Sequence, residues 1–300
     1  MSRVAIVTGS SAGIGLATAL ELARRGHALR LVGRDPAKLE AARRAVAAIT
    51  PDVAAFRADF SSLDEVRSFA DAVLARDEAL HVLVHNAGVW HPEFRRSKDG
   101  FEDTFAVNHL APFLLTHLLL PRMRDTSGDR RIVHVSSRLH VQAGQTASVR
   151  GRVVHAANVI GVRLAGAGAR FDFDALDRAD GYRGIEAYAR SKLAQVIFSA
   201  ELARREKAIT SNAVHPGSVA TEVTRGNKLL FAFQPLSKLI LKSPEQGAET
   251  SVYVATSPAL AGVTGRYFAR SREARAADVA EDRTVAERLW KLSAERVGLA

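Results

Sequence analysis

The chain has 300 residues, of which 47% are hydrophobic and 25% charged, so it can bury the core of one large globular domain. It has no cysteine, which excludes disulfides, thiolate nucleophiles and cysteine-ligated metal sites. The net charge of +10 would suit a polyanionic partner. However, no Lys/Arg cluster alternates with aromatic residues as a single-strand binding track requires, so we expect no nucleic-acid partner.

Short apolar runs alternate with longer helical segments along most of the chain, as buried parallel strands and their crossover helices do. The strands are predicted at Val4–Val7, His27–Val32, Val53–Arg57, His81–His85, Ile132–Ser136, Ile209–Val214 and Tyr267–Phe268. The helices are predicted at Ile14–Arg25, Lys38–Ala48, Ser62–Leu74, Phe101–Met123, Ile185–Lys207, Pro244–Thr256 and Val285–Arg296. This alternation predicts a single α/β domain, doubly wound, with a mostly parallel sheet and helices on both faces.

Local signals mark several helix ends. Gly26 stands where a left-handed residue closes the first helix, and Asp35 followed by Pro36 opens the second. Ser62 and Glu65 have the spacing of a capping box.

The sequence contains no pattern that would direct it into or across a membrane. An apolar strand begins by Val4, which leaves no room for a signal peptide. The longest strongly apolar stretch, Leu110–Leu120, is too short to span a bilayer. We therefore expect a cytoplasmic protein.

A glycine-rich turn joins the first strand to the first helix. Glycine allows a tight turn and close approach of a pyrophosphate, and the helix N-terminus supplies N–H groups and a positive dipole end. The spacing differs from the usual G-x-G-x-x-G fingerprint, and a purely structural turn is the alternative. The predicted dinucleotide contacts are Gly9, Ser11, Gly13, Ile14 and Gly15.

Arg34 follows the second strand, where a dinucleotide places its adenosine ribose. A guanidinium at this point favours a 2′-phosphate, whereas an acidic side chain would favour a 2′-hydroxyl. Arg34 therefore favours NADP over NAD, with a solvated surface arginine as the alternative. The neighbouring Asp35 is explained by its role as a helix cap.

Tyr188 and Lys192 lie four residues apart on a predicted helix and so share one face. An ammonium close to a phenol favours the phenolate and lowers the pKa of the tyrosine toward the working range of an acid/base. The pair alone is weak evidence because such spacing also arises by chance.

The motifs occur in a set order that is more specific than any one of them. Ser10–Gly15 is followed by Asn86-Ala-Gly88, Asn108, Ser136-Ser137, Tyr188/Lys192 and His215–Thr221. With this set, nearly the whole chain resembles the short-chain dehydrogenase/reductase family, which has a Rossmann-like fold. Three further stretches are similar to its retinol-dehydrogenase-like branch: Phe171–Leu176, Ser243–Thr250 and Leu289–Ser293.

The resemblance implies a role for each matching residue. Tyr188 would be the general acid/base, Lys192 would lower its pKa and hold the nicotinamide ribose, Ser137 would bind the substrate oxygen, and Asn108 would organise a water-linked proton relay. Further cofactor contacts are implied for Asp59, Asn86, Ala87, Gly88, Pro216, Gly217, Val219 and Thr221. Hydride transfer needs only such positioning, one acid/base and an oxygen stabiliser.

The chain departs from the family between Ser137 and Tyr188, where 51 positions separate two residues that usually lie closer. The extra material is assigned to an insertion at 142–168, which would either rim the substrate pocket or form a neutral surface loop. A predicted substrate lid at 222–243 contains the apolar stretch Lys228–Lys242 and implies a lipophilic substrate. That stretch could also contact a membrane surface, or pack in the core or in a homo-oligomer.

Metal binding is not expected, since His81 and His85 would share a strand face without a third ligand. Nor does a G-x-S-x-G elbow surround Ser137, which argues against a hydrolase nucleophile. The sequence therefore predicts NADP-dependent interconversion of a carbonyl and an alcohol on a lipophilic small molecule. The alternatives are reduction of a C=C bond on the same scaffold and a non-catalytic NADP(H)-binding sensor.

Overall fold

The computed structural model of the protein describes residues 2–143, 169–217 and 242–299. One eight-stranded sheet has the order β3-β2-β1-β4-β5-β6-β7-β8, and only β8 runs antiparallel to its neighbour. The strands are β1 Val4–Thr8, β2 Ala28–Gly33, β3 Val53–Arg57, β4 Val82–His85, β5 Arg131–Val135, β6 Thr210–His215, β7 Tyr267–Ala269 and β8 Arg272–Ala274. The predicted strands are confirmed to within two residues at each end.

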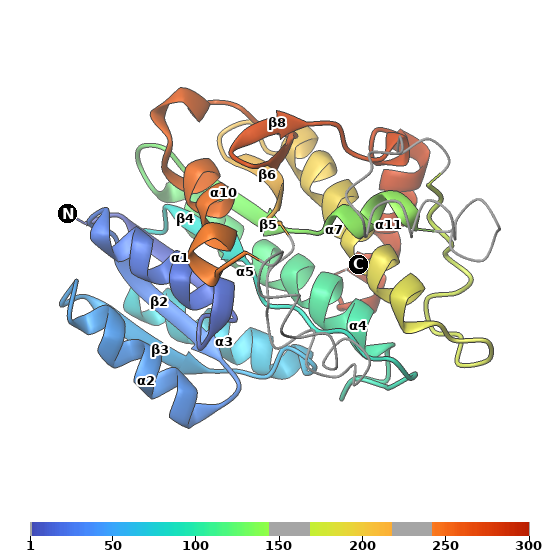
Figure 1. The fold of residues 1–300 in the computed structure, drawn as a ribbon, viewed down its shortest axis with the longest axis horizontal. Coiled ribbons are helices and arrows are strands. Elements are labelled where there is room, and N and C mark those ends of the chain that lie inside the picture. Colours follow the sequence, from blue (N-terminus) through green and yellow to red (C-terminus); the bar gives the residue numbers. More distant parts are fainter. Residues whose placement is uncertain (1, 144–168, 218–241, 300) are drawn as a thin grey trace.

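Helices cover both faces of the sheet (Figure 1). The longer ones are α1 Gly13–Arg24, α2 Pro36–Ala47, α3 Leu63–Arg76, α5 Ala111–Asp125, α7 Gly184–Arg205, α10 Pro244–Thr256 and α11 Arg283–Arg296. The short ones are α4 Asp103–Phe105, the π-helix η1 Ala106–Leu110, and the 3-10 helices η2 Arg138–Gln142, η4 Pro258–Leu260 and η5 Asp278–Ala280. The predicted single doubly wound domain is confirmed.

The side chains of β1 contribute to two separate hydrophobic cores, one on each face of the sheet, because successive residues of a strand point to opposite faces. Ala5 and Val7 pack with α1, α2 and α10, whereas Val4 and Ile6 pack with α3, α5, α7 and α11. All four residues are buried. This is why the strand reads as a continuous apolar run rather than an alternating one.

Most of the predicted helix ends are present. Gly26 has a φ of +81° just beyond α1, and the Asp35 carboxylate accepts the backbone N–H of Lys38 at 3.0 Å. The capping box predicted at Ser62 is only half present. The Ser62 hydroxyl accepts the Glu65 N–H, but the Glu65 carboxylate accepts the Asp59 N–H at 2.9 Å instead of returning to Ser62.

The predicted helix around Phe101–Met123 is one continuous helix from Asp103 to Asp125, formed by α4, η1 and α5. By length and composition it could cross a membrane, which corrects the expectation drawn from Leu110–Leu120 alone. However, 83% of its apolar window is buried inside the protein. Its apolar character is that of a core helix.

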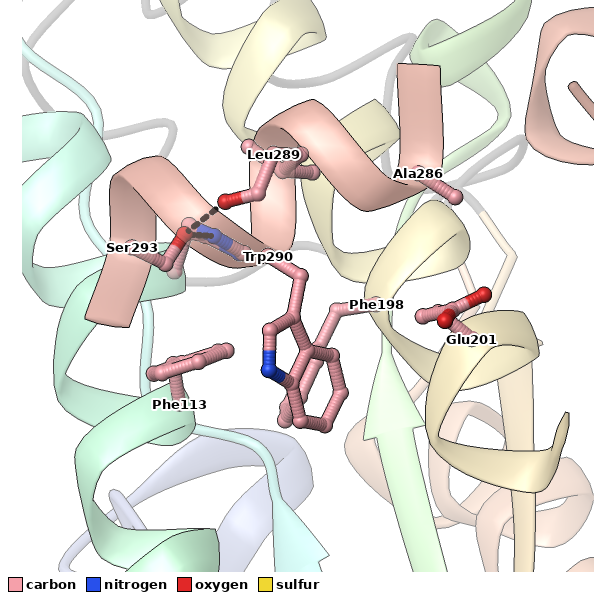
Figure 2. A pocket seen from close by; sticks show the side chains of 8 residues that line it. Phe113, Phe198, Glu201, Ala286, Leu289, Trp290 and Ser293 are labelled. Atoms are coloured by element: carbon pink, nitrogen blue, oxygen red, sulfur yellow. Dashed lines mark hydrogen bonds between the residues drawn. The ribbon is translucent and has the colours of Figure 1, made fainter. Parts of the chain in front are cut away.

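The C-terminal helix α11 closes the outer side of the core beside α5 and α7. Trp290 lies edge-on to Phe113 and packs against Phe198, with ring centroids 5.2 and 5.7 Å apart (Figure 2). The Ser293 hydroxyl donates to the Leu289 carbonyl (Figure 2). These described side chains leave no water-sized space between them, so this face is packing rather than a ligand site.

Some expectations fall outside the structure or were incomplete. The insertion beyond 143 and the lid up to 241 lie outside the described residues, and so do any contacts that they make. The edge strand β8 was not predicted. It is reached by a tight turn in which Arg270 and Ser271 both have positive φ, without the glycine that normally signals such a turn.

Candidate active site

The predicted site residues gather at one edge of the sheet because parallel strands share a direction. Most of them follow the carboxyl end of a strand: the glycine loop follows β1, Arg34 β2, Asp59 β3, Asn86–Gly88 β4, Ser137 β5 and Pro216–Gly217 β6. Asn108 in η1 and Tyr188 and Lys192 in α7 come from helices instead. The strand order reverses between β1 and β4, which are neighbours. A crevice outside the carboxyl ends at such a switch point is where ligands bind in open α/β sheets.

The loop after β1 can be built only with glycine at two positions. A methyl group on Gly15 would lie 2.2 Å from the carbonyl oxygen of Gly9, and one on Gly9 would lie 2.9 Å from the Cα of Ala87. Gly9 and Gly13 also have φ values of +65° and +58°. The first turn of α1 has no acidic residue and Ala12 gives no side-chain cap. The turn therefore offers N–H groups to an anion, as a dinucleotide pyrophosphate requires.

Asn86 ties this loop to β4. Its side-chain amide donates to the carbonyls of Thr8 and Gly9 at 2.8 and 3.3 Å. The Thr8 hydroxyl in turn accepts the backbone N–H groups of Asn86 and Ala87, both at 2.9 Å. Asn86 thus holds the glycine loop in place, and Thr8 is a site residue that the sequence analysis missed.

The adenosine end of the predicted site is formed by the ends of β1 and β2. Ser11 lies against Gly33, whose added methyl group would be 3.1 Å from the Ser11 hydroxyl oxygen. Arg34 comes next and is exposed, and it forms no ion pair within the described residues. A serine hydroxyl and an uncommitted guanidinium at this point suit a phosphate on the adenosine ribose.

Asp59 already has protein partners. Its carboxylate accepts the Ser61 N–H at 3.1 Å and lies 3.3 Å from the ammonium of Lys98. Burial raises the pKa of Asp59, but these hydrogen bonds outweigh it and the pKa is lowered overall. Asp59 is therefore a charged, fixed acceptor next to the adenosine end.

The nicotinamide end is described only in part. Pro216 and Gly217 follow β6, and Gly217 has a φ of +94°. A methyl group there would lie 2.8 Å from the Lys242 side chain. The other two predicted contacts in this motif, Val219 and Thr221, lie outside the described residues.

The structure brings Ser137, Tyr188 and Lys192 together. The Ser137 hydroxyl lies close enough to the Tyr188 hydroxyl to lower the pKa of the tyrosine, and the Lys192 ammonium lies 5.6 Å from the centroid of the Tyr188 ring. The 51 positions between Ser137 and Tyr188 therefore do not keep their side chains apart. Gly88 completes the group, since a methyl group there would lie 3.3 Å from the Lys192 ammonium.

The electrostatics of the pair differ from the expectation. Burial raises the pKa of the Tyr188 hydroxyl to about 12, and the nearby Ser137 hydroxyl offsets part of this rise. Burial also lowers the pKa of Lys192 to about 7. The Lys192 ammonium donates to the Val135 carbonyl and the Gln195 side chain, both at 2.9 Å. Because the ammonium is directed to these acceptors, the predicted lowering of the Tyr188 pKa is wrong for this arrangement.

Asn108 lies in the π-helix η1, a form that is frequent at functional sites. Its amide oxygen accepts the Val89 N–H at 2.8 Å. Its amide nitrogen donates to the Val89 carbonyl at 3.0 Å and to the Ser191 hydroxyl at 2.9 Å. Both N–H bonds of the side chain are thus used to join the loop after β4 to α7. The relay role implied for Asn108 stays a prediction.

Several residues that were given no role in the sequence analysis support the catalytic group. The Ser136 hydroxyl donates to the Lys192 carbonyl at 2.9 Å, and the side-chain oxygen of Gln195 accepts a hydrogen bond from the Lys192 ammonium. His140 contacts the Ser137 carbonyl at 2.7 Å through Nδ1 and accepts the Ala277 N–H through Nε2. These residues are buried and polar, and only the three-dimensional contacts show what they do.

Other sites in the described residues are less suited to chemistry. No group of three His, Asp or Glu side chains there could hold a metal ion. His81 accepts the Val4 N–H, whereas His85 stacks on His134 in the core, so these two histidines serve separate packing roles. A cavity of about 510 Å³ lies between α7 and the β7–β8 edge, but Arg266 and Glu273 on its lining pair with each other, and Arg275 pairs with Asp278.

The chain is similar to known proteins over almost all of its length. The family described as short chain dehydrogenase matches residues 3–151. Retinol dehydrogenase 13 of Homo sapiens is 39% identical over 99% of this chain and 85% of its own length. Retinol dehydrogenase 12 of Mus musculus is 36% identical over 99% of this chain and 87% of its own length.

Solved structures share the fold. An uncharacterized protein from Mycobacterium paratuberculosis has a TM-score of 0.73 at 28% identity, covering 99% of this chain and 93% of that one. A short chain dehydrogenase from Salmonella enterica has a TM-score of 0.66 at 24% identity, over 91% and 97% of the two chains. At that identity the second likeness shows the fold alone.

The glycine loop, the gathered Ser137, Tyr188 and Lys192, and these relatives place the chain in one class. It belongs to the short-chain dehydrogenase/reductase family, in its retinol-dehydrogenase-like branch. Members of this family use NAD or NADP, and the chain is an oxidoreductase that acts on alcohol and carbonyl groups.

Proposed function

We propose that the protein is an NADP-dependent oxidoreductase that interconverts a carbonyl and an alcohol on a lipophilic small molecule. The observation that carries this proposal is that the Tyr188 and Ser137 hydroxyls lie near each other beside Lys192. Two hydroxyls side by side can bind one substrate oxygen. Tyr188 would exchange a proton with that oxygen while Ser137 stabilises it.

Each residue has a definite task in this proposal. With its pKa at about 12, Tyr188 is protonated at neutral pH and is therefore ready to donate a proton to the oxygen of a carbonyl being reduced. The nicotinamide of NADP would supply the hydride. The buried Lys192 side chain is held beside the phenol by its hydrogen bonds to Val135 and Gln195. His140 and Ser136 hold the backbone of Ser137 and Lys192.

The cofactor residues at the phosphate and ribose end would be Gly9, Ser11, Gly13, Ile14, Gly15 and Arg34. The preference for NADP rests on the exposed Arg34 beside Ser11 at the end of β2, with no acidic side chain in the place of Arg34. NAD is the less favoured cofactor because its 2′-hydroxyl would not use the guanidinium.

A lipophilic substrate is supported by the relatives, which are named for retinol, an apolar alcohol. The apolar stretch 228–242 supports it from the sequence. We place the protein in the cytoplasm, with a small molecule rather than a nucleic acid as its partner. Contact with a membrane surface and homo-oligomer formation remain alternatives for the same apolar stretch.

The test is turnover of NADPH with a panel of apolar aldehydes and ketones. Turnover is measured as the loss of the absorbance of the reduced nicotinamide. We expect turnover with at least one class, and Tyr188→Phe should lower kcat by about 10³-fold because it removes the proton donor. The Kd for NADPH should change little. Binding of NADPH without turnover of any carbonyl would favour the sensor, and unchanged kcat in Tyr188→Phe would refute the assigned role.

A further inference from the structure

We propose that Glu102 is a positioning residue that holds the helix of Asn108 to the helix of Tyr188. The inference rests on the proposed function, because it assigns both helices to the active site. Glu102 is only 3% exposed and lies outside the family motifs used above, and it contacts both the helix of Asn108 and the segment that leads into α7.

Glu102 first caps the helix that carries Asn108. Its two carboxylate oxygens accept the backbone N–H groups of Thr104 and Phe105 at 3.0 and 2.7 Å. Its own carbonyl accepts the N–H of Ala106, the first residue of η1. The carboxylate is therefore fixed at the helix N-terminus, where the dipole favours a negative charge.

The same carboxylate also binds the segment that leads into α7. The Tyr182 hydroxyl donates to Glu102 Oε1 at 2.9 Å, and Tyr182 precedes the first residue of α7 by two positions. Asp177, in the same segment, accepts the backbone N–H of Glu102 at 3.0 Å. Residue 102 thus joins this segment through both its side chain and its backbone.

Two links connect the helices as a result. Asn108 lies six residues after Glu102, and Tyr188 lies six residues after Tyr182. The second link is the hydrogen bond from Asn108 to Ser191, whose hydroxyl donates to the Tyr188 carbonyl at 2.8 Å. With one link alone, the two helices could rotate relative to each other about that point. Two links fix both the distance and the angle between the helices.

The C-terminal helix supports the first link from outside. Arg296 of α11 pairs with the second oxygen of Asp177 at 2.5 Å and lies over the ring of Phe105. Arg190, on α7, is also within electrostatic reach of Glu102. The Glu102 carboxylate is therefore faced by the Arg190 cation, while Arg296 pairs with Asp177, the residue that accepts the Glu102 N–H.

Tyr182→Phe is the sharpest test, because it removes the side-chain part of the link to the segment before α7 and leaves the helix cap intact. Glu102→Ala would remove both and could unfold the helix end. Tyr253→Phe is the matched control: it removes a tyrosine hydroxyl from α10, where the ring packs on Phe268 away from this link.

We expect Tyr182→Phe to lower kcat by about tenfold, because small displacements of reacting groups are costly. The Kd for NADPH should stay within about twofold. In an Asn108→Ala background, where the second link is already lost, Tyr182→Phe should have less than half of that effect on a logarithmic scale. Amide hydrogen exchange should accelerate at 103–110 and 184–191 together in Tyr182→Phe, and in neither region of Tyr253→Phe.

The two proposals fail separately. If the wild-type protein reduces no carbonyl, the proposed function fails and hydrogen exchange alone decides the role of Glu102. Unchanged exchange in both regions, or a wild-type kcat in a folded Tyr182→Phe enzyme, would overturn the positioning role. A lower melting temperature with an unchanged kcat would do the same, since it would show a role in stability only.

Discussion

The two ends of the active site are built in different ways. At the cofactor end, the backbone makes the site: the glycines of residues 9–15 lie within one turn, and a methyl group on either Gly9 or Gly15 would collide with nearby backbone. At the catalytic end, side chains make the site, and their partners are distant in sequence. Asn108 and Ser191 are 83 positions apart, and Ser136 and Lys192 are 56 apart.

This difference determines how each end should respond to mutation. A loop whose binding groups are backbone atoms cannot relieve a clash by moving a side chain. The main chain must move, and the binding geometry is then lost. A side-chain network can lose one hydrogen bond and keep the others, so its losses should be graded. The predictions below test that contrast.

The largest effect on cofactor binding should come from Gly15→Ala. Its methyl group would lie 2.2 Å from the Gly9 carbonyl oxygen, so the loop must move away from its binding geometry. We expect the Kd for NADPH to rise at least about 100-fold, or about 2.7 kcal/mol. Isothermal titration calorimetry on the folded variant measures it.

Gly26→Ala is the control for that change. Gly26 has a φ of +81° but nothing within 4 Å of an added methyl group, so the cost is backbone strain alone. It should lower the free energy of unfolding by about 1 kcal/mol and leave the Kd for NADPH within about twofold. A folded Gly15→Ala protein with wild-type affinity would contradict the backbone-built site.

Arg34→Asp should have an intermediate effect that depends on the cofactor. Losing a charge-assisted contact to the 2′-phosphate costs about 1.5–3 kcal/mol, so the Kd for NADPH should rise about 10- to 100-fold. The Kd for NADH should change only a few-fold. Arg44→Asp makes the same charge change on the exposed surface of α2 and serves as the control. Equal losses for both cofactors would show that Arg34 does not contact the phosphate.

The last prediction concerns Lys192 and the free energy of unfolding rather than cofactor binding. In the folded state Lys192 loses its proton near pH 7, whereas the unfolded chain keeps it up to about the ordinary value of 10.5. Between these values the unfolded state binds more protons, so this group adds stability as pH rises from about 7 to 10.5. The difference in unfolding free energy between wild type and Lys192→Met should therefore shift in favour of wild type over that range.

Denaturant unfolding at several pH values measures that difference, with the exposed Lys291→Met as the control. A wild-type minus Lys192→Met difference that stays flat between pH 7 and 9 would contradict a buried lysine with a lowered pKa.

The same contrast explains what could be predicted from the sequence. The strands, the helices and the Asp35 cap follow from local patterns, because apolar periodicity and cap residues act over a few positions. The glycine loop is also local and was predicted as a binding turn. The catalytic residues were reached by resemblance, since nothing local in the sequence states that Ser137 meets Tyr188.

The features that could not be predicted from the sequence depend on contacts between residues that are far apart in the chain. Glu65 has the spacing of a capping box, yet its carboxylate binds the Asp59 N–H and the Lys98 ammonium. The raised pKa of Tyr188 depends on burial and on where the Lys192 side chain is directed. The π-helix at Asn108 and the edge strand β8 likewise have no local signal.

Transfer of a deuterium label tests the proposed reaction most directly. A conjugated apolar aldehyde would be reduced with NADPH that carries deuterium at both C4 positions, and the product would be analysed by mass spectrometry and NMR. Hydride transfer to a carbonyl predicts an unsaturated alcohol with one deuterium on the carbon that bears the hydroxyl. A saturated aldehyde labelled at the β-carbon, or a product without deuterium, would contradict it.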